Sequence, residues 1–329
     1  MLDVNIDKYK IIATFIIVKL CLGVTNNSWF NYLQQIQPED VNFWQPGGNV
    51  RFKSLNQREP FLFKLKSPEN AIGGVGFFSS HTFLPMSVAW EVFGNRNGCE
   101  TYEEFSRLIL GNRADKNNSN PQIGCIVLNN PVFFERKDWI ETPPDWSKSV
   151  QQWKGYVTET EIGNDIWQKV EQTVKRYWED KEQQPKEEFE FDEPGVPLYR
   201  SVLSNVRIGQ GAFKVKVIDA YQRRCSISGE KTLPVLEGAH IKPYSKSGPH
   251  STSNGILLRS DIHTLFDAGY LTITTDFKIE VSKRIREEFA NGKEYYQYHG
   301  KDLIVTPQNA FDRPHSQYID WHNANVFRG

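Results

Sequence analysis

The chain has 329 residues, which is long enough for two domains of ordinary size. Hydrophobic residues make up 39% and charged residues 24%, the composition of a soluble globular protein. The formal net charge is −1, so no overall basic field indicates a nucleic-acid partner. The four cysteines form no close pair, which excludes a CxxC zinc knuckle and a disulfide framework. Reduced thiols in a cytoplasmic protein are the favoured interpretation.

The N-terminal region is apolar, but it lacks the marks of an exported protein. The run 11–24 resembles the hydrophobic part of a signal peptide, yet Lys19 interrupts it and no small-x-small cleavage site follows. The run is also too short to cross a bilayer. We therefore expect a buried strand at 19–24 behind an N-terminal extension, 1–18, and a cytoplasmic protein without a membrane partner.

Short strands and helices alternate up to about residue 182. Asn26 and Ser28 offer side-chain oxygens that can cap a helix over 26–36. Ile166, Val170 and Val174 recur every four residues, which predicts one apolar face of a helix over 163–184. Further strands are expected at 60–68, 71–80 and 123–134, and further helices at 85–94 and 101–112.

An acidic, proline-containing stretch divides the chain. Segment 183–204 is too polar to bury much surface and is typical of a linker. Residues 201–329 hold 17 Lys and Arg against 13 Asp and Glu, so the C-terminal third is mildly basic. The sequence therefore predicts a first domain over 19–182 and a second over 205–329.

The second domain carries two histidines and an asparagine at open spacing. His240 follows "VLEGA" and precedes "IKP", which indicates a strand end where a side chain can project into a site. Asn254 precedes Gly255 in a turn before the apolar run "GILL". His263 and Asp267 lie four residues apart, on one face of a helix, where they can ligate one metal ion or share a plain hydrogen bond. Each residue alone is more often structural, but together they offer a general base, an orienting amide and a metal ligand.

The stretch "CSISGEKTLPVLEGAHIKPYS", followed by "TSNGILLRSDIHTLFDAGYLTI", resembles the HNH endonuclease family, in the branch whose first motif reads "AAHI.P". Flanking segments extend the resemblance to about 205–329. It implies a ββα-metal fold in which His240 takes a proton from water, Asn254 holds the loop or the His240 ring, and His263 ligates a divalent metal, Mg²⁺. These three residues are the expected catalytic set.

One position departs from this family pattern. Many relatives carry an acidic residue or a second histidine just before the general base, where this chain has Ala239. We expect Asp267, and after it Glu237, to complete the metal site with His263, because hard oxygen ligands suit Mg²⁺. The alternative for Glu237 is a surface carboxylate without a metal role.

Several basic and amide residues surround these motifs and could contact DNA phosphates. For any one of them a solvated surface position is the simpler alternative. The candidates are Arg207, Gln210, Lys214, Arg223, Arg224, Lys242 and Lys246.

The first domain resembles, through residues 40–80, the PUA-like superfamily that includes EVE, YTH and SRA-type domains. This resemblance implies an α+β protein with an N-terminal curved β-barrel that holds a flipped base in an aromatic cage. Trp44 and Trp90 are the expected base pocket, with packing in the core as the alternative for both.

A modified-base reader joined to an HNH nuclease resembles a modification-dependent restriction endonuclease. The two resemblances imply cleavage of double-stranded DNA that carries 5-methylcytosine or 5-hydroxymethylcytosine, by a homodimer or by two binding events. The alternatives are an HNH nuclease without modification preference, a nucleic-acid-binding protein whose nuclease site has decayed, and a secreted toxin nuclease.

Overall fold

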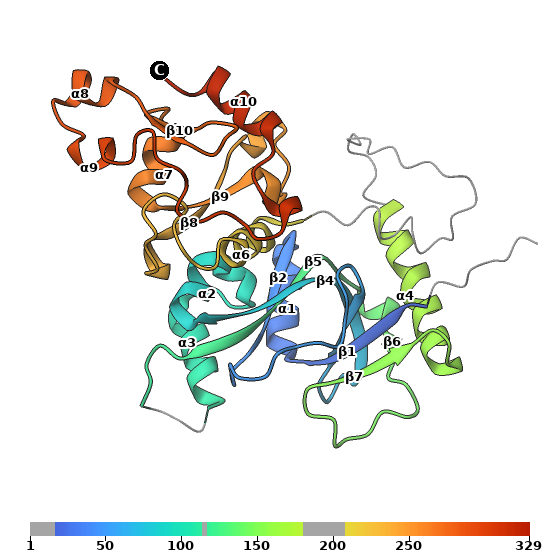
Figure 1. The fold of residues 1–329 in the computed structure, drawn as a ribbon. Helices are drawn as coiled ribbons and strands as arrows, with labels where there is room; N and C mark the ends of the chain where they lie inside the picture. The colour runs from blue at the N-terminus through green and yellow to red at the C-terminus, as the bar shows by residue number, and fades with distance from the viewer. Residues whose placement is uncertain (1–16, 114–116, 180–207) are drawn as a thin grey trace, which may run out of the picture.

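A computed structural model describes residues 17–113, 117–179 and 208–329. The linker 183–204, nearly all of the extension 1–18 and the candidate Arg207 lie outside the described residues. The described chain forms two lobes (Figure 1), a larger one built on a β-sheet and a smaller one that contains the C-terminus. The helix α6 lies where the two lobes meet.

A seven-stranded sheet forms the larger lobe. Its order is β2-β5-β4-β3-β1-β7, with β6 paired to β4, and only β1 and β3 run parallel. The strands are β1 Lys19–Thr25, β2 Asp40–Gln45, β3 Pro60–Leu65, β4 Ala71–Pro85, β5 Gln122–Phe133, β6 Ile140–Glu141 and β7 Trp153–Val157. The expected curved barrel is not confirmed, because among the described residues β2 and β7 form opposite edges of the sheet and do not pair. Helices bury the apolar faces of this open sheet instead.

The expected helices of the first domain are confirmed. They are α1 Asn27–Ile36, α2 Met86–Phe93, α3 Tyr102–Gly111 and α4 Glu161–Glu179, with short 3-10 turns at Gly94–Asn97 and Arg136–Asp138. Asn26 caps α1 by accepting the N–H of Ser28 at 2.8 Å. Ile166, Val170 and Val174 of α4 are buried against one face of the sheet, as their spacing predicts.

Helix α6, Gln210–Ala220, joins the two lobes through one continuous core. Its backbone N–H at Ala212 donates to the fully buried carboxylate of Asp40 on β2 at 2.9 Å, and Arg96 also pairs with that carboxylate. No helical pattern is visible in the sequence of this segment. Its alternating lysines and valines are typical of a strand, and nearly every face of the helix is buried.

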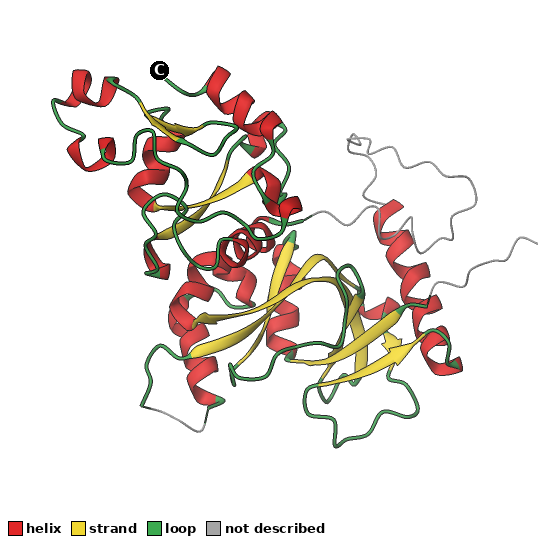
Figure 2. Ribbon diagram, in the orientation of Figure 1, coloured by secondary structure: helices red, strands yellow, loops and turns green. Residues whose placement is uncertain are grey.

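The smaller lobe is a set of short elements. They are β8 Leu236–His240, β9 Gly255–Arg259, α7 Ser260–Asp267, β10 Leu271–Ile273, β11 Ile279–Val281, α8 Arg284–Phe289, α9 Lys293–Tyr296 and α10 Ser316–Asn325, with 3-10 turns at Leu233–Val235, Tyr244–Lys246, Thr252–Asn254 and Ala310–Asp312. Strands β8 and β9 pair antiparallel, and α7 follows β9 directly (Figure 2). This is the strand, loop, strand and helix order that the HNH resemblance implies.

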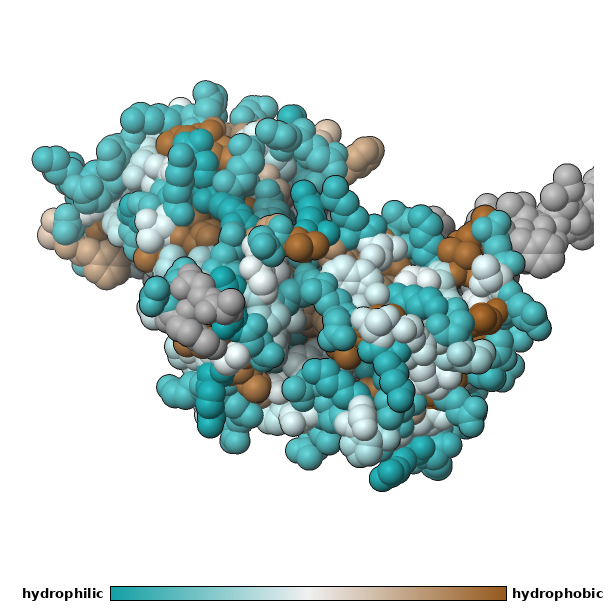
Figure 3. Space-filling model, turned by 90° about the horizontal axis from the view of Figure 1, so that it is seen from below, coloured by the Kyte–Doolittle hydropathy of each residue, from teal (hydrophilic) through white to brown (hydrophobic). Residues whose placement is uncertain are grey.

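The surface of the protein is mostly polar on the face shown in Figure 3. None of the helices among the described residues is both long and apolar enough to cross a membrane. The face seen in Figure 3 is mostly hydrophilic, and its apolar residues form small separate groups.

Candidate active site

His240 ends strand β8 and is held between two elements. It pairs across the sheet with Gly255, the first residue of β9. A Cβ at Gly255 would lie 2.5 Å from Val217 and 3.0 Å from the ring of Phe213, so only glycine lets α6 approach this closely. The Phe213 ring then stacks on the His240 ring, with centroids 3.8 Å apart and planes at 13°. The ring of His240 is thereby fixed in orientation.

A second histidine, His250, completes this stack. Its Nδ1 lies 2.9 Å from Nε2 of His240, and the Tyr244 ring stacks on it with centroids 4.4 Å apart. His250 is not among the site residues expected from the sequence, where its only signal is its place in the loop between His240 and Asn254. Because His250 occupies Nε2 of His240, Nδ1 is the ring nitrogen of His240 that has no hydrogen bond among the described contacts.

His240 is a neutral imidazole near pH 7. Burial, and then the neighbouring His250, lower the pKa of His240 to about 4, although the carboxylate of Asp267 acts to raise it. The pKa of His250 is also lowered, mainly by burial. A neutral ring carries a free lone pair, which a general base requires. The charges of His263 and Asp267 both act on the His240 ring.

Asn254 is fully buried and braces the loop that follows β8. Its Oδ1 accepts the N–H of Lys242 at 2.9 Å, and its Nδ2 donates to the carbonyls of Lys242 at 2.9 Å and Pro249 at 3.0 Å. Among the described contacts it holds this loop rather than the His240 ring. The bond to Pro249 fixes the residue just before His250, so Asn254 acts on the histidine pair through the backbone.

The His263 ring lies between two carboxylates. Its Nδ1 is 2.5 Å from Oε2 of Glu237 on β8, and its Nε2 is 3.2 Å from Oδ2 of Asp267 one turn along α7. Burial disfavours the charged ring, but the hydrogen bonds to Asp267 and Glu237 outweigh it and raise the pKa of His263. The helical spacing predicted from the sequence therefore brings His263 and Asp267 together.

These carboxylates differ in what they can offer a metal ion. The two ring nitrogens of an imidazole point in diverging directions, so Glu237 and Asp267 cannot converge on one ion through His263. Within the part of the chain that the structure describes, no three His, Cys, Asp or Glu side chains are arranged to hold a metal. The ligand set of His263, Asp267 and Glu237 therefore stays a prediction.

A two-residue metal site does fit the observed donors. Nε2 of His263 and Oδ2 of Asp267 lie side by side, while Glu237 accepts from Nδ1, as a carboxylate commonly does behind a metal-ligating histidine. The remaining positions would fall to water and phosphate oxygens, which Mg²⁺ retains or accepts readily.

The departure at Ala239 has a structural counterpart. Ala239 is 1% exposed and packs in the core, so a carboxylate here would be buried. Glu237 lies two residues earlier, on the same face of β8, and brings its carboxylate to His263 from there.

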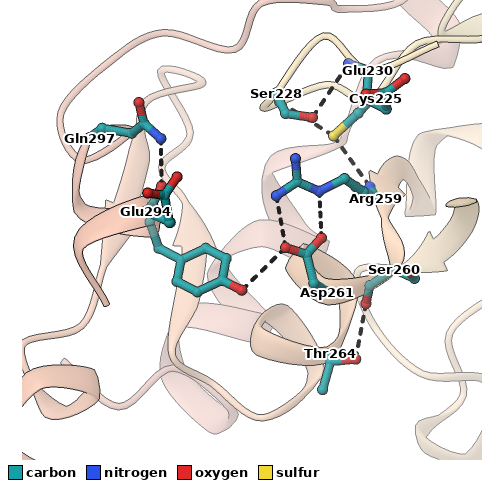
Figure 4. Close-up of polar contacts among 10 residues, drawn as sticks. Cys225, Ser228, Glu230, Arg259, Ser260, Asp261, Thr264, Glu294 and Gln297 are labelled. Carbon is teal, nitrogen blue, oxygen red and sulfur yellow. Dashed lines mark hydrogen bonds and ion pairs between the residues drawn. The ribbon is translucent and has the colours of Figure 1, made fainter. Parts of the chain in front are cut away.

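A polar network anchors the start of α7 (Figure 4). Arg259 donates to both carboxylate oxygens of Asp261, at 2.6 and 2.8 Å, and Tyr295 donates to the same carboxylate at 3.2 Å. The buried thiol of Cys225 accepts the backbone N–H of Arg259 at 3.3 Å. This network fixes the helix that carries His263 and agrees with a structural role for Cys225.

The candidate DNA contacts lie in different surroundings. The charge of Lys214 acts on the His240 ring. Gln210 and Lys246 are exposed at the surface. Lys242 places its Nζ 5.7 Å from the centre of the Trp321 ring.

The two neighbouring arginines have other environments. Arg223 donates to Thr82 Oγ1 at 2.9 Å and to the carbonyl of Phe83 at 2.6 Å, so it joins the two lobes although part of its side chain is exposed. The Nε of Arg224 is buried with no hydrogen-bond partner among the described residues.

Trp44 and Trp90, the expected base pocket, both pack against Phe105 on α3. Their ring centroids lie 6.0 and 5.8 Å from that of Phe105. The indole N–H of Trp44 donates to the carbonyl of Asn97 at 2.9 Å. Both rings belong to the margin of the core, which is the alternative that the sequence left open.

Comparison with known proteins gives a family match within the smaller lobe. Residues 225–274 match the family model described as HNH endonuclease. This match contains His240, Asn254 and His263, and it confirms the expected class of enzyme. No curated protein matches the chain significantly.

Solved structures give further, more distant likenesses. A modification-dependent restriction endonuclease, TagI, is 24% identical, with a TM-score of 0.26 over 35% of this chain and 37% of that chain. The ASCH protein of Zymomonas mobilis is 8% identical, with a TM-score of 0.32 over 45% of this chain and 94% of that chain. A mutant form of the same ASCH protein is 6% identical, also with a TM-score of 0.32, over 46% of this chain and 97% of that chain.

Proposed function

We propose that this protein is a metal-dependent endonuclease that hydrolyses phosphodiester bonds in double-stranded DNA and restricts DNA containing modified cytosine. The observation that supports the nuclease chemistry is the neutral His240 at a strand end, beside His263 and Asp267 and within the matched HNH segment. The sequence resemblance of residues 40–80 to modified-base readers supports the substrate preference. A cytoplasmic location and the layout of a reader at 19–182 and a nuclease at 205–329 belong to the same proposal.

The role of each side chain follows from its partners. With Nε2–H donated to His250, Nδ1 of His240 is left as the acceptor that takes a proton from water. The protonated ring keeps its bond to His250, and Asn254 keeps the loop in place. Nδ1 of His263 is held by Glu237, so Nε2 faces Asp267. A divalent ion bound there would stabilise the charge that develops on the phosphate and the leaving oxygen.

DNA itself improves His240 as a base. A pKa of about 4 gives a weak base at neutral pH, although the ring is in the right protonation state. A phosphate anion brought beside the ring favours its protonated form and so raises the pKa toward the working pH. We therefore expect the basicity of the His240 ring to increase when the substrate binds.

Cleavage of defined plasmids tests this function. Purified protein with Mg²⁺ is incubated with the same plasmid in unmodified, 5-methylcytosine and 5-hydroxymethylcytosine forms, with EDTA as the metal control. We expect cleavage of the modified forms only, and none in EDTA. Linear plasmid formed by cutting both strands in one event would indicate a homodimer or paired binding events. Accumulation of nicked plasmid would indicate a single active site that acts alone.

A nuclease without modification preference is the second candidate. The observation that favours it is the packing of Trp44 and Trp90 on Phe105, which engages both expected cage residues in the fold. Equal cleavage of all three plasmids would establish this candidate. Binding without cleavage of any plasmid would instead establish a decayed nuclease site and overturn the proposed chemistry.

A further inference from the structure

The first turn of α6 has no capping side chain of its own. Its N-cap residue is Gly209, and Gly211 lies within the turn, so neither supplies a side-chain oxygen for the free backbone N–H groups. Glycine also has the most backbone freedom to lose when it enters a helix. This turn therefore depends on partners outside the helix.

Asp40 on β2 provides the missing cap from the larger lobe. Its Oδ2 accepts the backbone N–H of Ala212 at 2.9 Å, which is the bond that an N-cap side chain ordinarily makes to the third residue of a helix. The carboxylate is fully buried, and its negative charge lies at the positive end of the helix dipole. A Cβ at Gly209 would clash with this oxygen, so only glycine lets the helix begin this close to Asp40.

Arg96 holds the other oxygen of the Asp40 carboxylate. Its Nη1 pairs with Oδ1, while its Nε and Nη2 donate to the carbonyls of Phe93 at 3.0 Å and Val92 at 2.7 Å. These two carbonyls lie at the end of helix α2. The guanidinium is thus fixed by the larger lobe, and it fixes the carboxylate that caps α6.

The residue that follows Ala212 contacts the proposed general base. Phe213 stacks on the His240 ring with centroids 3.8 Å apart, and its centroid lies 5.6 Å from that of His250. Such a contact restricts rotation of the imidazole about its side-chain bonds. The turn that Asp40 caps therefore sets the position of Phe213 and, through it, the orientation of His240.

We propose that Asp40 is a positioning residue for DNA cleavage: by capping α6 across the two lobes, it holds Phe213 against the His240 ring and fixes the direction of the nitrogen that accepts the proton. Asp40 is fully buried and cannot touch the substrate, so it acts only through the helix. The inference rests on the proposed function, in which His240 is the general base. It implies that the larger lobe completes the active site of the smaller one.

Nuclear magnetic resonance of the histidine rings tests this positioning apart from cleavage. In the full chain without metal, proton–carbon correlation spectra report the C–H groups of the seven histidines, and His240→Ala assigns those of His240. The ring current of a stacked aromatic side chain moves such signals upfield. His322, which stacks on Phe266 with centroids 3.9 Å apart, is the internal standard for a folded smaller lobe.

Two substitutions of Asp40 separate the cap from the side chain as a whole. Asp40→Ala removes the acceptor, whereas Asp40→Asn keeps an oxygen that can accept from Ala212. We expect the His240 signals of D40A to move downfield, toward those of an unstacked ring, while the His322 signals stay in place. D40N should keep the His240 signals close to those of the wild type.

Asp138→Ala is the matched control. Asp138 is also a mostly buried carboxylate of the larger lobe, with its side chain 10% exposed, and it pairs with an arginine, Arg176 of α4, at 3.2 Å. Its loss removes a comparable ion pair without touching α6. We expect D138A to leave the His240 signals and the cleavage rate unchanged.

Cleavage kinetics measure the consequence for the reaction. We expect kcat of D40A to fall about 10- to 100-fold with little change in KM, because a misplaced base slows the chemical step. D40N should recover most of this loss. Phe213→Leu removes the stacking ring and leaves the cap intact, and it should lower kcat as D40A does.

The outcomes separate this inference from the proposed function. Wild-type His240 signals in a folded D40A would overturn the inference, whatever the value of kcat. A wild-type kcat in F213L would also overturn it, even if D40A does not fold. Equal losses of kcat in D40A and D138A would do the same, because a general loss of stability would explain both. Shifted His240 signals in D40A, with no cleavage of any plasmid by the wild type, would uphold the positioning by Asp40 and overturn the nuclease proposal.

Discussion

The two polar clusters of this protein use their hydrogen-bonding atoms in opposite ways. Around His240 and His263 the polar atoms are tied to one another, through His250, Glu237 and Asp267. On the sheet of the larger lobe, buried polar atoms of Gln45 on β2 and of His81 on β4 have no partners among the described residues, and these two residues are called the Gln45–His81 cluster. The first cluster is arranged before any substrate arrives, which is what catalysis by a positioned base requires. The second leaves buried polar groups unpaired, which lowers the stability of the fold.

His240→Ala is expected to have the largest effect. A positioned general base contributes about 10²- to 10⁴-fold to a rate, so cleavage should fall by that factor. The initial rate of plasmid cleavage in Mg²⁺ measures it, and DNA affinity in EDTA should stay at the wild-type value. His299→Ala, at an exposed histidine of the same lobe, is the control. If H240A keeps the wild-type cleavage rate, the cluster around His240 and His263 has only a structural role, and the comparison between the two clusters fails.

Substitutions of the two carboxylates that contact His263 should differ in their effect on metal affinity, because only Asp267 is a proposed metal ligand. Asp267→Asn removes a proposed ligand and should raise the half-saturating Mg²⁺ concentration the most. Glu237→Gln removes the charge behind the ring, and such outer partners are worth about 10- to 100-fold in metal affinity. Activity measured against Mg²⁺ concentration gives both values. The reverse order, with E237Q the more severe, would make Glu237 the ligand.

His250 should affect the rate more than substrate affinity. His250→Phe keeps a ring for Tyr244 to stack on but removes the acceptor for Nε2 of His240. We expect a fall in kcat of about ten- to a hundredfold with little change in KM, because a poorly positioned base slows only the chemical step. His250→Asn, which restores an acceptor, should recover part of the rate. Equal losses in H250F and H250N, or a loss confined to KM, would contradict a positioning role.

The sequence predicted the elements whose signals are local. Helix α1 has its cap at Asn26, and α4 has an apolar residue every fourth position, so both were predicted correctly. His240, Asn254 and His263 were picked out in order because the motif around them is contiguous. The helical spacing of His263 and Asp267 was likewise enough to predict their contact.

Features that depend on distant pairing were not predictable. Closure of the sheet requires β2 to meet β7, and no local pattern reports whether it does. Helix α6 is buried on nearly all sides, so it shows no amphipathic period. His250 and His81 looked alike in the sequence as single histidines, yet one is bonded to His240 and the other has no partner among the described residues. Only the register of β2, β4 and β5 brings His81 to Gln45.

The Gln45–His81 cluster should respond to substitution in the opposite sense to the first cluster, by gaining stability. A buried polar group without a partner costs about 1–3 kcal/mol, so His81→Phe should raise the free energy of unfolding by up to that amount at pH 7.5. This increase in the free energy of unfolding should be larger at acidic pH. The pKa of His81 is about 4 in the folded protein and near 6.5 when unfolded, so the unfolded wild type takes up more protons as the pH falls from about 6.5 to 4.

The wild type therefore keeps the contribution of His81 to its free energy of unfolding above about pH 6.5 and loses it as the pH falls toward 4. The H81F variant has no imidazole at this position and does not show this loss. Thermal unfolding of both proteins at pH 7.5 and pH 5 measures the difference, and the gap in Tm should be wider at pH 5. A lower Tm for H81F at both pH values would mean that His81 has a stabilising partner in the folded protein. In that case the contrast between the two clusters would disappear, because both would consist of internally bonded side chains.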